Sequence, residues 1–64
     1  MEGLKKRALD LIEIKISSLR MAPSYFMCDQ ITGSAALLQD LGVISFEEYV
    51  EIRDRCWDCF ENAY

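Results

Sequence analysis

The chain has 64 residues, of which 52% are apolar, and a net charge of −4, so it forms one small domain (1–64) rather than an intrinsically disordered chain. It contains no histidine, which excludes imidazole-based nucleophile pairs and histidine-ligated metals. No stretch of 18 uncharged residues is present, which argues against a membrane span. Because so short a chain buries only roughly 60% of the surface that it exposes when unfolded, we expect dimerisation to complete its core.

Apolar residues near the start of the chain recur at helical spacing, which predicts a helix over residues 3–21. At about 100° per residue, they fall within an arc of about 160°. Four of them repeat at intervals of three, four and three: Leu9, Ile12, Ile16 and Leu19. This spacing is typical of helices that pair along a seam, so we assign these residues to a core or dimer face. Lys15 lies inside the same arc, and Pro23 ends the helix.

The middle of the chain allows two interpretations. Five apolar residues recur at intervals of three or four and predict one helical face: Met27, Ile31, Ala35, Leu38 and Leu41. A helix therefore covers at least residues 30–41. It begins either near Ser24, with Pro23 close to its first position, or after a loop, with Asp29 or Thr32 as its cap.

The segment that follows carries strong signals for a tight corner between two helices. Gly42 stands where a left-handed helix end is expected. Ser45 and Glu48 have the spacing of a capping box, and Ile44 and Tyr49 that of a hydrophobic staple. We therefore predict that a new helix begins at Phe46.

This last helix, predicted over residues 46–63, separates aromatic from acidic side chains. Four aromatic residues extend the predicted core or dimer face: Phe46, Tyr49, Trp57 and Phe60. Five carboxylates line the other half: Glu47, Glu51, Asp54, Asp58 and Glu61. Like charges four residues apart repel each other, and along this helix only the spacing of Glu51 and Arg55 offers relief. Such a row is either a solvated face or a docking face for a basic protein.

Residues 37–49, with the sequence LLQDLGVISFEEY, resemble the helical hairpin of short C-terminal oligomerisation segments of the SHOCT type. In size and composition the whole chain also resembles the small accessory proteins of temperate phages. These resemblances imply a helical protein that works by binding other proteins.

Three cysteines, Cys28, Cys56 and Cys59, are an odd number for a disulfide framework, which favours a reducing cytoplasm. Cys56 and Cys59 form a Cys-x-x-Cys motif, but it lies near the end of a helix and beside Asp58, where both influences raise a thiol pKa. Zinc usually takes four Cys or His ligands, and this chain offers three. We expect small apolar side chains that pack between helices, with no metal or cofactor; a zinc- or thiol-dependent module is a remote alternative.

The charge is unevenly distributed between the two parts of the chain. Residues 1–20 contain five cationic and three acidic side chains, a net +2, whereas residues 21–64 contain two and eight, a net −6.

No convergent set of acid, base and nucleophile indicates an enzyme. A helix-turn-helix at residues 37–49 would direct acidic side chains at phosphates, although the Lys5-Lys6-Arg7 triplet leaves a DNA-binding accessory protein as the alternative. The sequence predicts an all-α bundle, two long helices with a third between them, that acts as a homodimeric regulator or inhibitor of a basic protein.

Overall fold

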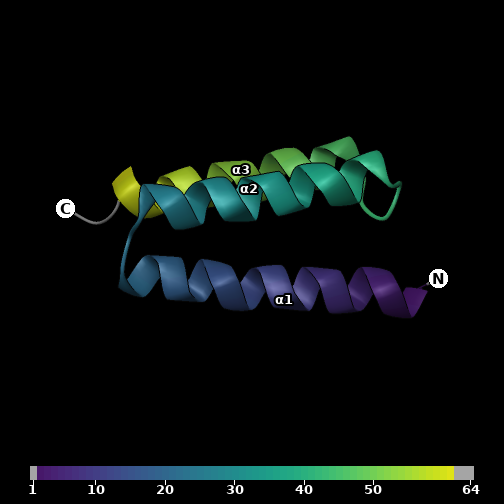
Figure 1. Cartoon of the computed structure of the whole chain (residues 1–64), viewed down its shortest axis with the longest axis horizontal. Helices are drawn as coiled ribbons and strands as arrows, with labels where there is room; N and C mark the ends of the chain where they lie inside the picture. The colour runs from purple at the N-terminus through teal and green to yellow at the C-terminus, as the bar shows by residue number, and fades with distance from the viewer. Residues whose placement is uncertain (1, 62–64) are drawn as a thin grey trace.

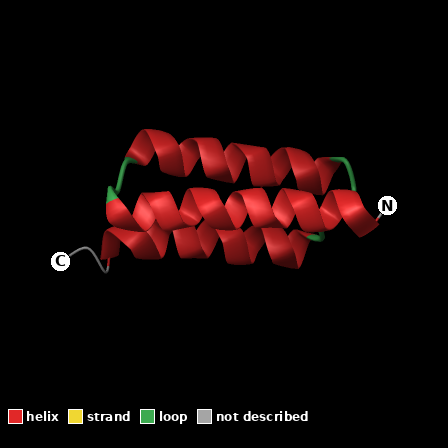
Figure 2. Cartoon of the chain, turned by 90° about the horizontal axis from the view of Figure 1, so that it is seen from below, coloured by secondary structure: helices red, strands yellow, loops and turns green. Residues whose placement is uncertain are grey.

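A computed structural model of the chain describes residues 2–61, which form three helices and contain no strand. The helices are α1 (Glu2–Met21), α2 (Tyr25–Asp40) and α3 (Phe46–Glu61). They lie alongside one another in an elongated bundle of 39 × 17 × 16 Å, in which α1 and α3 run in the same direction and α2 runs in the opposite one (Figures 1 and 2). The all-α prediction is confirmed, and α2 is as long as α3. The predicted end of the last helix, near residue 63, lies outside the described residues.

The turn between α1 and α2 matches the longer of the two helices considered for the middle of the chain. Ser24 is the N-cap of α2, with extended backbone angles of φ −148° and ψ 127°. Its hydroxyl accepts a hydrogen bond from the backbone N–H of Met27 at 3.4 Å. Pro23 therefore precedes the cap rather than occupying the first helical position, and α2 begins at Tyr25.

The corner between α2 and α3 has both predicted capping motifs. Gly42 adopts a φ of +76°, and the backbone N–H of Val43 donates to the carbonyl of Leu38 at 2.9 Å, which closes a Schellman motif. The backbone N–H of Ser45 donates to the Glu48 carboxylate at 2.9 Å, while the backbone N–H of Glu48 donates to the Ser45 hydroxyl at 3.1 Å. The capping box is thus confirmed, and it fixes where α3 begins.

The core is built from aliphatic and small side chains contributed by all three helices and the corner. Its ten buried residues are Ile12, Ile16, Leu19, Cys28, Ile31, Ala35, Ile44, Ile52, Cys56 and Cys59. The contact between α2 and α3 is the most extensive of the three helix contacts, because Cys28, Ala35 and Cys56 are small and completely buried there. No aromatic residue of the described chain is fully buried.

Candidate protein-binding face

The structure places every carboxylate of the predicted acidic face on the outside of α3. Glu47, Glu51, Asp54, Asp58 and Glu61 are all exposed. Their spacing of four, three, four and three residues aligns them in one stripe along the helix, opposite the buried side chains of Ile52, Cys56 and Cys59. We call these five residues the acidic row.

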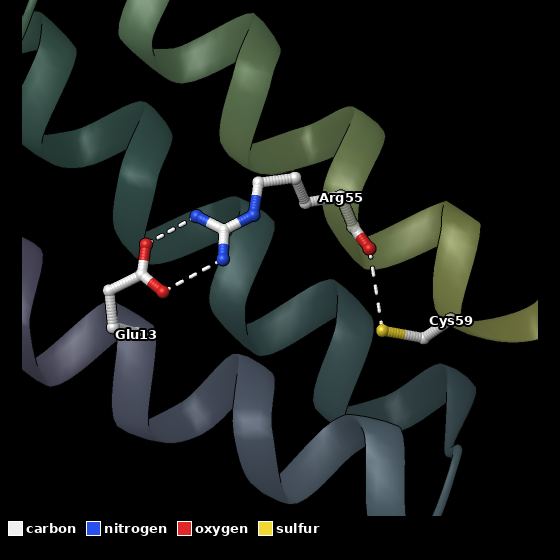
Figure 3. A network of polar contacts seen from close by, with 3 residues as sticks. All are labelled: Glu13, Arg55 and Cys59. Atoms are coloured by element: carbon white, nitrogen blue, oxygen red, sulfur yellow. Dashed lines mark hydrogen bonds and ion pairs between the residues drawn. The ribbon is translucent and has the colours of Figure 1, made fainter.

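Most carboxylates of the acidic row stay unpaired because Arg55, one of the two cations of α3, pairs with another helix. Figure 3 shows Arg55 reaching across to α1, where its guanidinium makes two contacts with the Glu13 carboxylate; the Nη2–Oε2 distance is 2.7 Å. Sequence spacing had suggested Glu51 as the partner of Arg55. Within the acidic row only Asp54 has an ion pair among the described residues, a 3.7 Å contact with Arg53.

A second ion pair joins the beginnings of α1 and α3. Lys5 Nζ lies 3.1 Å from Glu48 Oε1, so the basic triplet of α1 is partly used inside the molecule. The hydrogen bond from the Ser45 backbone, and then Lys5, lower the pKa of Glu48. The hydrogen bonds that the Arg55 guanidinium donates lower the pKa of Glu13. Both ion pairs follow from α1 and α3 running side by side in one direction, which sequence spacing within a single helix cannot reveal.

A strip of four apolar residues and one cation, Arg53, borders the acidic row. Each of its members precedes a carboxylate by one residue, so the two rows run side by side along α3; we call Phe46, Val50, Arg53, Trp57 and Phe60 the aromatic edge. Trp57 is 44% exposed and Phe46 is 63% exposed. Tyr25 of α2 extends the edge, since its ring stacks on Phe60 with centroids 4.4 Å apart and lies 6.1 Å from the ring of Trp57.

Lys15 and Arg53, two cations at positions within the predicted apolar faces of their helices, occupy different environments. Arg53 is half-buried, and its guanidinium lies 5.9 Å from the centre of the Tyr49 ring, a distance suited to a cation–π contact. Lys15 is exposed on α1. Among the described residues, neither cation pairs with a carboxylate of another helix.

The structure divides the predicted core or dimer face. On α1, Ile12, Ile16 and Leu19 are buried within the single chain and Leu9 packs against them; we call these four residues the core seam. On α3, Tyr49 and Phe60 pack partly against the core, whereas Phe46 and Trp57 are exposed. The completely buried positions of α2 and α3 are occupied by Cys28, Ile31, Ala35 and Cys56, so no ring is fully enclosed in the core.

The three thiols lie at the contact between α2 and α3. All three are buried and free. Cys59 donates to the carbonyl of Arg55 at 3.3 Å (Figure 3). Burial raises the pKa of Cys28, and it raises the pKa of Cys56 to about 12, which suppresses the reactive thiolate. No group of three Cys, Asp or Glu side chains within residues 2–61 is arranged to hold a metal ion.

A hollow of about 150 Å³ lies between α1 and α3, and its polar lining is mostly engaged in the capping box and the two ion pairs. The residues around it are Leu9, Glu13, Glu48, Glu51, Ile52 and Arg55. The ion pair between Glu13 and Arg55 within this lining links α1 to α3.

No protein-family model, curated protein or solved structure matches the chain. None of the helices described by the structure combines the length and apolar character needed to cross a bilayer.

Proposed function

We propose that the protein is a non-enzymatic, homodimeric protein-binding module that regulates or inhibits a partner with a basic surface. The observation that carries this proposal is the acidic row, five exposed carboxylates that the bundle leaves almost unpaired. Like charges at this spacing lower helix stability slightly. A binding role gives a reason for retaining them.

The aromatic edge supplies apolar contact area, which a row of charges lacks. Charged rows mainly accelerate association, whereas residence time depends on desolvated apolar contacts near the centre of an interface. Trp57 and Phe60, held by Tyr25, lie beside Asp58 and Glu61 and can fill a pocket between basic residues. The acidic row extends over 14 residue steps from Glu47 to Glu61, or about 21 Å at 1.5 Å per step, which is long enough to occupy a groove that normally follows a nucleic-acid backbone.

The experiment compares two charge-reversal variants as bait in the source cell extract. One is Asp54→Lys with Asp58→Lys in the acidic row. The other is Asp29→Lys with Asp40→Lys, which makes the same change in net charge at exposed positions of α2. We expect the basic partner to be captured by the wild type and the α2 variant, and lost from the α3 variant.

Kinetics with the purified partner then separate the two contributions. The α3 variant should reduce the association rate about tenfold or more at low salt and flatten its salt dependence. Trp57→Ala should mainly increase the dissociation rate. Equal kinetics for the α2 and α3 variants would show that the acidic row serves only solvation. Retention of the wild type on heparin, with salt-sensitive DNA binding, would instead favour the DNA-binding alternative.

A further inference from the structure

The outer side of α1 carries a second stripe of residues at coiled-coil spacing. Its members follow one another at intervals of three, four, three, four and three and are all exposed: Leu4, Arg7, Leu11, Ile14, Ser18 and Met21. We call this set the outer stripe. Its four apolar side chains are between 49% and 88% exposed.

The outer stripe differs from the core seam, which already faces α2 and α3. Ile12 and Ile16 of the core seam are at most 4% exposed, whereas Leu11 and Ile14 of the outer stripe are 59% and 62% exposed. A surface helix ordinarily has one apolar stripe and a polar opposite face. The α1 helix has apolar residues on both sides. The outer stripe extends over 17 residue steps from Leu4 to Met21, or about 26 Å at 1.5 Å per step.

We propose that α1 pairs with α1 of a second copy, in antiparallel orientation, about a twofold axis between residues 12 and 13. Under this symmetry residue i faces residue 25 − i. Leu11 then packs on Ile14 of the second copy and Leu4 packs on Met21, while Arg7 faces Ser18. All six positions of the stripe are matched, and the surface is self-complementary, as a closed twofold interface requires.

Charge selects this orientation over a parallel one. A parallel pair would place the two Lys5-Lys6-Arg7 triplets together and would set Arg7 against Arg7 inside the seam. The antiparallel pair separates the two Arg7 side chains by 11 residues of helix, or about 16 Å. It also opposes the dipoles of the two helices. A parallel pair would gain only exposed contacts between Asp10 and Lys15, and such exposed ion pairs contribute little.

This interface defines how the two chains of the proposed homodimer pair. It rests on the proposed function only because both require a homodimer. The acidic row lies on another helix and stays free in both copies, so the dimer presents two such rows. Binding of a basic partner by α3 in a single copy does not require the dimer. The two proposals can therefore fail independently.

Sedimentation equilibrium over a concentration series from low to high micromolar tests the dimer. We expect the wild type to reach a mass of two chains, and Leu11→Lys with Ile14→Lys to remain a single chain with unchanged helicity. The matched control is Leu37→Lys with Leu41→Lys, which places the same charges at exposed leucines, one in α2 and one at its C-cap, and should dimerise like the wild type. A wild type that stays monomeric throughout, or an α1 variant that still dimerises, would overturn the proposal.

Disulfide trapping tests the orientation, since the native thiols are buried. One chain carries Arg7→Cys and the other carries Ser18→Cys. An antiparallel pair predicts that a mixture of the two chains oxidises to the 7–18 heterodimer, with little product from either chain alone. Predominant 7–7 and 18–18 products would refute the antiparallel arrangement. Partner association measured with the Leu11→Lys, Ile14→Lys chain should keep the wild-type rate, which separates this test from that of the acidic row.

Discussion

Gly33 and Gly42 are nine residues apart in the sequence, but their backbone conformations differ, so a side chain has a different effect at each position. Gly33 lies inside α2, and a Cβ added there would meet no atom within 4 Å. Gly42 also has open space around it, but its φ of +76° is a conformation that side chains disfavour. Space alone therefore does not decide which glycine the fold needs.

We predict that Gly33→Ala and Gly42→Ala change stability in opposite directions. The first should raise the free energy of unfolding by about 0.5–1 kcal/mol, because alanine has the higher helix propensity. The second should lower it by about 1 kcal/mol or more, because it strains the helix end. Urea denaturation of the two variants beside the wild type measures both values. A shift of the same sign in both variants would contradict this account of the corner.

At the scale of single elements, the carboxylates of Glu13 and Glu48, which form the ion pairs between α1 and α3, make the stability of the protein depend on pH. Their pKa values are lowered in the folded protein from an ordinary value of 4.5, mainly by Arg55 for Glu13 and by the Ser45 backbone for Glu48. The unfolded chain therefore binds more protons than the folded one as the pH falls past 4.5. The stabilisation from both groups is complete above that pH and is lost as the pH falls through the lower folded values.

We therefore predict that the free energy of unfolding increases with pH up to about 5 and that Glu13 and Glu48 account for part of the slope. Glu13→Gln with Glu48→Gln should flatten the dependence, as measured by urea denaturation across the acidic range. Glu47→Gln is the control, because Glu47 has no ion pair among the described residues. The explanation fails if the control flattens the slope as much as the double variant does.

The elements themselves were readable from the sequence where local chemistry determines them. Helical periodicity, Pro23 and the Gly42–Ser45 corner gave the all-α fold and the beginning of α3. The acidic row was also readable, since one helix suffices to align it. The sequence did not reveal that Arg55 pairs with Glu13, because that contact depends on the relative direction of two helices.

The aromatic residues show a second limit of local pattern. Phe46 and Trp57 have the spacing of a buried face, yet they lie at the rim because the core is filled by smaller side chains. The apolar arc of α1 similarly contains two surfaces, the core seam and part of the outer stripe. Periodicity shows that a helix has an apolar face, but the partner helices decide which part of that face is buried.

For the whole molecule, the unequal extent of the helix contacts predicts that the helices differ in how well their amide hydrogens are protected from exchange. The contact between α2 and α3 is the most extensive, and these two helices carry four of the five residues that are completely buried in the described chain, whereas α1 contacts each of the others less. We expect amide hydrogens around Ile31 and Cys56 to exchange only on global unfolding, and those of α1 to exchange faster in dilute solution. Hydrogen-exchange mass spectrometry measures this order. Slower exchange in α1 than in α2 and α3 at the same dilution would contradict it.

The position of Trp57 has a practical consequence. It is the only tryptophan in the chain, and it remains 44% exposed in the folded state, among the rings of Tyr25 and Phe60. Folding removes only part of the water around the indole, so its fluorescence should respond modestly to denaturation. A protein that covers the aromatic edge would remove much of the remaining water and shift the emission to shorter wavelength. The unlabelled protein can thus report by its own fluorescence when this edge is covered.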